Sequence, residues 1–486
     1  MSASTVALTG IFAIVIIGTA IGLYAGARRK MDLEQWTVGG RGFGAALIWL
    51  LMAGEIYTTF TFLGASGWVY SRGAPALYIL AYQPLAYIVS FYILPRIWEA
   101  GRKHGLQTQA DFFRMRYGSK PLAIFVAVVG IAFIIPYLQL QLTGLGIIVE
   151  VASFQAIGRT PAMLIAFTLV ASFVFTSGVR GVAWVSILKD GLLLLAVLFI
   201  GIAIPYIHFG GVAPLFAAVA SAKPEQLVMP GATQNLGHAW FVSTVLLSAL
   251  GFYMWPFGFG ATLTARSADT LRRNAILLPL YSITVPLILF VGLTALLVVP
   301  GLANGDLSLL ILVRQTFPPW LLGVIGGAGA LTAMVPAAMM ILTAATLFAK
   351  NVWRPLFAPA MSDSSVAALA RAMVPVITAV ALFFAIFSST TLVSLLLLGY
   401  AGVTQFFPGV VLGLYSKRVT AAAIFSGLVV GIAIVAALML SGRDPYFGVN
   451  AGFIALCANF AVVAGLSLLQ PAREVAAPEA VRAIPP

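Results

Sequence analysis

Apolar runs of roughly 20 residues or more recur along the chain and are separated by short polar segments. A helix needs about 20 apolar residues to cross the hydrocarbon core of a bilayer. The runs do not alternate apolar and polar residues, as the strands of a membrane barrel would. The pattern therefore predicts an all-α membrane protein with one integral domain over residues 1–470. Residues 471–486 are rich in Pro and Ala and are predicted to form a disordered cytoplasmic tail.

Thirteen transmembrane helices are predicted from these runs. Their ranges are 6–25, 44–70, 75–97, 122–149, 161–179, 182–207, 239–265, 275–299, 321–349, 366–386, 390–415, 421–440 and 447–469. The segment 300–319 is predicted to be an external loop, with a short interfacial helix as the alternative.

The second predicted span carries a glutamate, Glu55, in its middle, together with several glycines. A carboxylate at membrane depth costs at least a few kcal/mol, and each glycine loosens a helix by about 1 kcal/mol relative to alanine. Such a span is typical of a broken transport helix. Helical spacing would place Glu55, Thr58 and Thr59 on one face, and the neighbouring hydroxyl of Tyr57 is a further candidate for substrate binding. The alternative is an ordinary packing helix whose glutamate is protonated or paired.

The seventh predicted span contains the sequence GFYMWPFGFG. Gly251 and Pro256 are expected to break the helix there, because proline removes a backbone donor and clashes with the preceding turn. Tyr253 and Trp255 could then line a small-molecule site at the break. The alternative for these rings is an aromatic belt at the membrane surface.

Two other spans carry polar groups at membrane depth. Tyr400, Thr404 and Gln405 lie in the eleventh span, where their partner could be the substrate or another helix. Lys189 lies in the sixth span and could be a counter-charge for Glu55 or for an anionic substrate, or its ammonium could extend to the inner surface. Because Lys189 and its neighbour in the sequence, Asp190, point about 100° apart on a helix, they are not expected to form a simple stacked pair.

Composition agrees with a membrane protein, since 61% of the residues are hydrophobic and 8% are charged. A net charge of +13 would suit a nucleic-acid binder, but the basic residues cluster between apolar runs, as in the positive-inside loops of membrane proteins. With the N-terminus outside and the C-terminus inside, only five of the 27 Lys and Arg fall outside: Arg72, Arg159, Lys223, Arg314 and Arg443.

No enzymatic chemistry is indicated by the sequence. The three histidines lack the spacing of metal ligands, and there is no catalytic triad signature or phosphate-binding glycine loop. The single cysteine, Cys457, excludes an internal disulfide. We expect no enzyme activity, no cofactor, no nucleic-acid partner and no obligatory protein partner.

Four segments together resemble the sodium:solute symporter family, in order and in spacing. They are MAGEIYTTFTFLGASG, HGLQTQADFFRMRYGS, FYMWPFGFG followed by ARSADTLRRNA, and TAATLFAKNVWRP. The resemblance covers about residues 5–470. It implies a leucine-transporter type of fold with two inverted five-helix repeats, in spans 2–6 and 7–11. Around GFYMWPFGFG and GGAGALTAMVPAA the chain looks most like bacterial monocarboxylate permeases, whose substrates include lactate, pyruvate, acetate and alanine.

The resemblance also bears on the coupling ion. It implies a cation site made by backbone carbonyls of Ala53 and Ile56 with two hydroxyls of the ninth span. Those two hydroxyls are replaced here by Val335 and Pro336, and Thr332 lies one turn earlier. Because Na⁺ requires several oxygen ligands, this departure favours H⁺ coupling over Na⁺ coupling, with Glu55 as the proton carrier.

The sequence therefore predicts a symporter of the bacterial inner membrane that imports small monocarboxylates with H⁺ or Na⁺. One alternative is a Na⁺ symporter of another small solute, such as an amino acid or a vitamin acid. A channel and a membrane-embedded sensor are further alternatives, and the short tail argues against the sensor.

Overall fold

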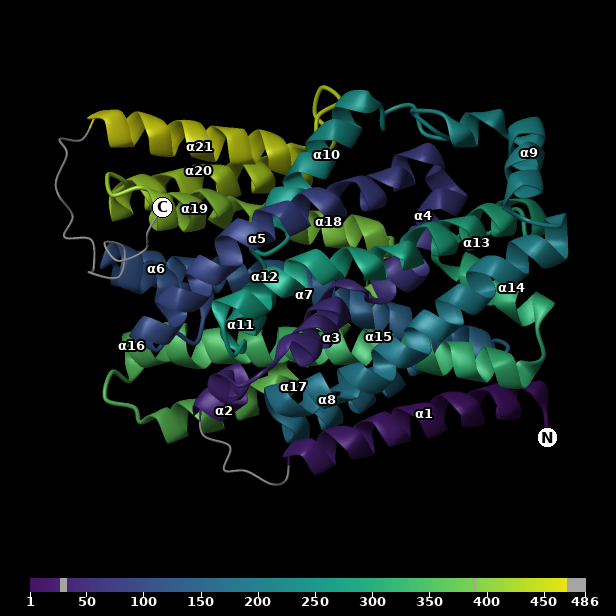
Figure 1. Ribbon diagram of the computed structural model, residues 1–486, viewed down its shortest axis with the longest axis horizontal. Coiled ribbons are helices and arrows are strands. Elements are labelled where there is room, and N and C mark those ends of the chain that lie inside the picture. The colour runs from purple at the N-terminus through teal and green to yellow at the C-terminus, as the bar shows by residue number, and fades with distance from the viewer. Residues whose placement is uncertain (27–32, 388–389, 470–486) are drawn as a thin grey trace.

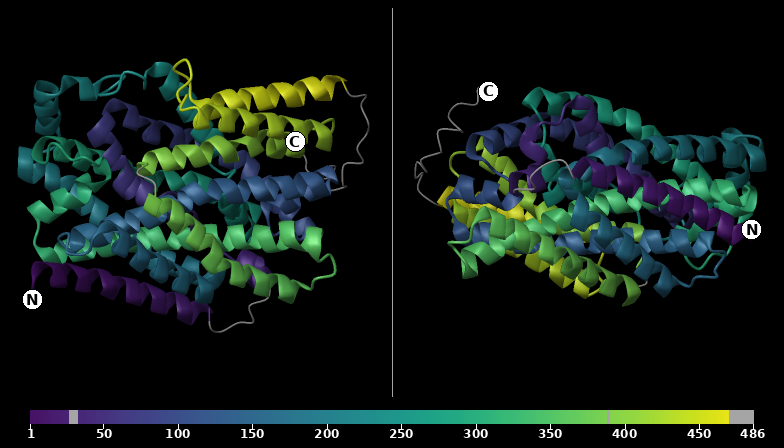
Figure 2. Two further views of the ribbon diagram at one scale, coloured as in Figure 1. Left: turned by 180° about the vertical axis from the view of Figure 1, so that it is seen from behind. Right: turned by 90° about the horizontal axis from the view of Figure 1, so that it is seen from below.

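The computed structural model describes residues 1–26, 33–387 and 390–469, and the regular structure in these ranges is helical apart from two isolated β-bridges. The predicted tail lies outside the described residues. Most helices run along the long axis of the molecule, with α1 at one edge and the pair α20 and α21 at the opposite edge (Figures 1 and 2). An all-α membrane fold, as predicted, is confirmed.

The helices follow the apolar runs closely. Their bounds are α1 Ala3–Gly26, α2 Leu33–Val38, α3 Ala45–Ile56, α4 Ala65–Arg72, α5 Tyr78–His104, α6 Gln109–Tyr117, α7 Lys120–Ala152, α8 Arg159–Phe209, α9 Val212–Ala222, α10 His238–Gly251, α11 Pro256–Leu263, α12 Ala268–Leu277, α13 Thr284–Val298, α14 Ser308–Thr316, α15 Pro319–Thr346, α16 Arg354–Phe357, α17 Asp363–Phe387, α18 Leu392–Val403, α19 Phe407–Tyr415, α20 Ala421–Leu440 and α21 Ala451–Leu469.

The number of membrane-length helices is smaller than the sequence pattern suggests. In the described ranges, 11 helices are long and apolar enough to cross a membrane, or 12 when α3 and the segment Phe60–Arg72 count as one bent span. The predicted fifth and sixth spans both lie in α8, in which two helical segments meet at the non-helical backbone of Gly178 (φ 58°, ψ 179°). The part before the kink, Arg159–Phe175, is too short to be counted. Thirteen spans and the two inverted repeats remain predictions.

The segment 300–319 contains the nine-residue helix α14, Ser308–Thr316, and is not an open loop throughout. Helix α14 has buried residues from Ser308 to Val313 and contacts α4, α7 and α15. It therefore packs on the protein and does not lie as an isolated helix at the lipid surface.

Two spans are interrupted near the middle of the molecule, as the glycine and proline positions predicted. The first interruption separates α3 from α4, and the two flanking segments meet at a bend of 53°. The second separates α10 from α11 over residues 252–255. Helices α5, α7, α15 and α18 contact one or both of these broken spans, so the interruptions lie inside the helix bundle.

Candidate functional site between the two broken helices

The first break begins where α3 ends at Ile56. Tyr57 leaves the helical conformation (φ −90°, ψ 87°), and a π-helical turn follows over Phe60–Gly64. The helical spacing on which the single face of Glu55, Thr58 and Thr59 was predicted does not continue through the break, so the shared face stays a prediction. Thr58 lies 3.3 Å, Oγ1 to Oη, from Tyr137, whereas Thr59 donates a hydrogen bond to Gln141.

A buried ammonium group contacts the last turn of α3. Lys189 of α8 donates from Nζ to the carbonyl oxygen of Gly54 at 3.2 Å and forms an ion pair of 2.8 Å with Asp190 Oδ1. The lysine and aspartate side chains are fully buried. Although the two neighbours point about 100° apart on the helix and were not expected to form a simple stacked pair, they form an ion pair, because the long lysine stem brings its ammonium back to the adjacent carboxylate. Tyr281 also donates to Asp190 Oδ1, at 3.0 Å.

Gly54 favours this close approach. A Cβ atom at position 54 would lie 3.1 Å from Ser186 Oγ and 3.6 Å from Lys189 Nζ. The glycine therefore leaves α3 close enough to α8 for the ammonium to reach a main-chain carbonyl.

Glu55 is buried, with 4% of its surface exposed, and it lines a small central cavity. Its Oε1 atom has no hydrogen-bond partner within the described part of the chain. A buried carboxyl oxygen that lacks a partner has a free position for a proton or for a polar ligand.

The second break supplies aromatic rings. Pro256 begins α11, where its missing N–H costs nothing. Trp255 lies just before it, with its ring centre 5.3 Å from that of Tyr400 and 4.9 Å from that of Tyr137. Side chains of Glu55, Tyr253, Trp255 and Tyr400 all line the central cavity, so the structure brings these predicted residues together.

The central cavity is almost closed in this conformation. Its volume is about 30 Å³, which is enough for a single water molecule. Residues that the sequence analysis did not single out complete the lining; they include Met52, Phe60, Phe252 and Leu396. Their apolar or aromatic character resembles that of ordinary core residues, so no local pattern distinguishes them.

Other candidate residues hydrogen-bond the protein itself. Tyr57 contacts Gln83, Tyr87 and Ser282. Thr404 donates to the carbonyl of Leu247, Gln405 donates to those of Ala401 and Gly452, and Thr332 donates to that of Ala328.

The two candidate ion-binding carbonyls also have partners. The carbonyl of Ala53 accepts from the N–H of Tyr57, and that of Ile56 accepts from Thr61 at 3.4 Å. Their roles, and those of the other candidate residues, stay predictions.

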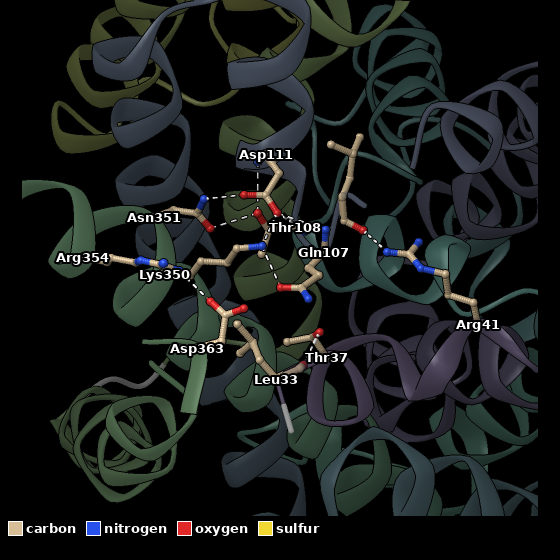
Figure 3. Close-up of polar contacts among 11 residues, drawn as sticks. Leu33, Thr37, Arg41, Gln107, Thr108, Asp111, Lys350, Asn351, Arg354 and Asp363 are labelled. Carbon is tan, nitrogen blue, oxygen red and sulfur yellow. Dashed lines mark hydrogen bonds and ion pairs between the residues drawn. The ribbon is translucent and has the colours of Figure 1, made fainter. Parts of the chain in front are cut away.

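A polar cluster joins α6 to the end of the α15 span, away from the N-terminal end of the molecule (Figures 1 and 3). Thr108 and Asp111 form a reciprocal capping box at the start of α6. Lys350 Nζ lies 2.7 Å from Asp111 Oδ2, and Asn351 donates to Oδ1 at 2.9 Å. Burial acts to raise the pKa of Asp111, but the Lys350 ammonium and the surrounding N–H donors lower it below its usual value.

Helix α6 also contacts the second break directly. Gln109 donates from Nε2 to the carbonyl oxygen of Met254 at 3.0 Å. The sequence analysis did not predict this contact, because it joins segments far apart in the chain. The start of α6 itself could be predicted from the Thr-x-x-Asp pattern at 108–111, which is typical of a helix N-cap.

Comparison with known proteins identifies the kind of protein that carries this site. The sequence profile of the sodium:solute symporter family matches residues 36–431. The chain belongs to the sodium:solute symporter family. It is 45% identical to an uncharacterized symporter, YhjB, of Bacillus subtilis, with 98% of this chain and 99% of that protein covered. It is 30% identical to a monocarboxylate transport permease protein of Rhizobium johnstonii, with 95% and 96% covered.

The fold of this symporter family member agrees with that of solved transporters. A structure of a Na⁺-coupled sialic acid symporter in a substrate-bound outward-open state superimposes with a TM-score of 0.80 at 17% identity. It covers 97% of this chain, and 99% of that chain is covered in turn. The predicted family and the prediction of a transporter rather than an enzyme are confirmed.

Proposed function

We propose that this protein is a proton-coupled symporter that imports small monocarboxylates across the bacterial inner membrane, with its N-terminus outside and its C-terminus in the cytoplasm. Lactate, pyruvate, acetate and propionate are the candidate substrates, with alanine as a further one. The relative from Rhizobium johnstonii, named as a monocarboxylate transport permease, supports this substrate class.

The contact between the Lys189 ammonium and the Gly54 carbonyl carries the proposal of proton coupling. The candidate carbonyl ligands for a coupling cation are those of Ala53 and Ile56, and the Gly54 carbonyl between them is bound to a cation that belongs to the chain. Val335 and Pro336 add no side-chain oxygens. Since Na⁺ needs several oxygen ligands, a built-in ammonium and two missing hydroxyls favour a cycle without Na⁺.

Glu55 is the proposed proton carrier. Its carboxyl lines the central cavity and has an oxygen without a partner among the described residues, so it can gain or lose a proton as water or substrate enters. Tyr253, Trp255 and Tyr400 would contact the substrate, since their rings line the same cavity. Transport would follow alternating access, in which the broken spans move against the surrounding helices.

A Na⁺-coupled symporter of another small solute is the second candidate. It is favoured by the family itself, which is named for sodium, and by the fold shared with a Na⁺-coupled sialic acid symporter.

Uptake by purified protein in liposomes tests the proposal. One set of vesicles carries an inward proton gradient in Na⁺-free buffer, and the other carries a Na⁺ gradient at equal pH. We expect accumulation of lactate or pyruvate in the first set and none in the second, beyond the passive entry measured in protein-free liposomes. Accumulation driven by Na⁺ alone would contradict proton coupling, and transport of neither acid in either set would contradict the substrate class.

A further inference from the structure

We propose that a cavity at the C-terminal end of α4 is a second binding site for the carboxylate group of a small solute. Arg72 would supply the positive charge of this site. This inference takes its substrate class from the proposed function but concerns a different cavity. The site would hold the solute before it reaches the central cavity.

The cavity lies at the end of the broken span α3–α4. It is bordered by α4, by the segment preceding α10, by the start of α18 and by the loop between α20 and α21, and its volume is about 380 Å³. Small-molecule sites typically have volumes of about 300–1,000 Å³. The outer cavity can therefore hold a small organic acid, whereas the central cavity of about 30 Å³ cannot.

Arg72 lines this cavity, and its guanidinium is held in place by neighbouring side chains. Its guanidinium lies over the ring of Trp68, 5.8 Å from the ring centre, and Nη1 donates to Thr233 Oγ1 at 2.7 Å. Within the described ranges, no carboxylate lies within 4 Å of it. A guanidinium has five N–H donors, so several stay available for the paired oxygens of a carboxylate.

Trp68 offers a second donor. Its ring lines the same cavity and is 7% exposed, and its buried indole N–H has no hydrogen-bond partner among the described residues. Buried donors of this kind are normally satisfied, so an unsatisfied one beside an arginine that has no carboxylate partner among the described residues indicates a ligand that accepts hydrogen bonds.

Asp444 is the carboxylate of the chain that shares this cavity, and it does not neutralise Arg72. Its Oδ1 accepts from the N–H of Ala451 at 2.9 Å. Burial raises the pKa of Asp444, and the hydrogen bond from the Ala451 N–H lowers it in part.

A layer of packed rings separates the outer cavity from the central one. Trp240 stacks on Trp68 with ring centres 6.5 Å apart and meets Tyr78 at 5.6 Å. Tyr78 in turn stacks on Tyr82 at 6.0 Å, and Tyr82 meets Tyr400 at 6.2 Å. The two tryptophans line the outer cavity, and Tyr82 and Tyr400 line the central one. A solute bound by Arg72 would therefore lie next to the rings that must move before it can enter the central cavity.

Protection of an introduced thiol from labelling tests the site. The exposed Cys457 is replaced by alanine, and Asn235, which is exposed and lines the outer cavity, is replaced by cysteine. A membrane-impermeant maleimide then labels position 235 in the full-length protein in liposomes. Lactate and alanine are the carboxylate probes, and the uncharged methyl ester of lactate is the control ligand.

Four variants separate this site from the central one. We expect lactate to protect the thiol at position 235 in Trp255→Ala, whose central site is damaged. Arg72→Gln should raise the half-protecting concentration about ten-fold, because a charge-assisted hydrogen bond is lost, and Arg72→Lys should raise it less. Arg443→Gln removes an exposed charge from the same end of the molecule and should leave protection unchanged.

Protection that disappears in Trp255→Ala and persists in Arg72→Gln would overturn the outer site, because one central site would then explain it. Lactate uptake without any protection would also overturn it, and the proposed function would stand. Arg72-dependent protection by lactate without uptake would support the outer site and contradict the proposed function. Protection by alanine but not by lactate would replace the anion with a zwitterion as transported solute, still at an Arg72 carboxylate site.

Discussion

At each of the two helix breaks, a side chain from another helix binds a backbone carbonyl, but the two side chains differ in charge. At the first break, the carbonyl of Gly54 is bound by the Lys189 ammonium, and Glu55 lies beside it. At the second, the carbonyl of Met254 is bound by the neutral amide of Gln109, and the neighbouring side chains are aromatic. The central cavity lies between them and is lined by both. The charged groups and the aromatic rings are therefore placed on separate helices, so that each can be altered while the other is kept.

The charged break should be the costlier one to disturb. Replacing Lys189 with methionine would leave Asp190 as a buried carboxylate without its cation, which typically costs about 3–5 kcal/mol. We expect a large loss of thermal stability in detergent and no uptake. The double variant Lys189→Met/Asp190→Asn should recover most of the stability but not pH-driven uptake. If the double variant transports normally, the ammonium is a packing group and not part of the coupling machinery.

Glu55→Gln separates coupling from folding. The amide keeps the size of the side chain but cannot carry a proton, so accumulation driven by a pH gradient should fall to the level of protein-free liposomes. Exchange of lactate across the membrane at equal pH should persist. Glu225→Gln, at an exposed position, is the matched control. Unchanged accumulation in Glu55→Gln would mean that another group carries the proton.

The second half of the first broken span depends on a different carboxyl. A Cβ at Gly67 of α4 would lie 2.6 Å from Asp306 Oδ1, and Asp306 Oδ2 accepts from the N–H of Leu392 at the start of α18. Burial raises the pKa of Asp306 to about 7. The folded protein therefore holds this proton more tightly than the unfolded chain, where the pKa is about 3.9, so stability should fall as the pH rises from about 4 to 7.

Asp306→Asn should flatten that pH dependence. A difference of about three units corresponds to at most about 4 kcal/mol, so the variant should be less sensitive to pH and more stable than the native chain at pH 8. Melting temperatures in detergent between pH 4 and 8 would measure this, with the exposed Asp269→Asn as control. Parallel curves for the native chain and Asp306→Asn would show that Asp306 does not titrate in this window.

The aromatic break should be the more tolerant of the two. Trp255→Ala removes ring contacts with Tyr137 and Tyr400, and we expect about a ten-fold higher apparent KM for lactate with proton coupling intact. Trp320→Ala, at an exposed position, should change neither KM nor maximal rate. An unchanged KM in Trp255→Ala would place substrate binding elsewhere, and a loss of proton coupling would erase the contrast between the two breaks.

The positions of the breaks could be predicted from the sequence because they depend on local properties of glycine and proline. Contacts across helices could not. The partner of Lys189 depends on how closely α8 approaches α3. Gly54 allows a close approach, but a glycine in the sequence does not show which helix lies against it. Thr58 and Thr59 were placed on the face of Glu55 by a helical repeat that the break itself interrupts.

Arg72 shows the same limit at the N-terminal end. In the sequence it was one of five basic residues on the side with few of them, and it received no role. Its place above Trp68 and beside Thr233 results from folding a segment about 160 residues later against the end of α4.

The ammonium on α8 has a consequence for the transport cycle. A coupling ion taken from solution enters with the solute and leaves with it, so the empty carrier returns without that charge. Lys189 is tied to the chain by covalent bonds and never dissociates. Its local concentration at the break therefore does not change with the salt content of the medium.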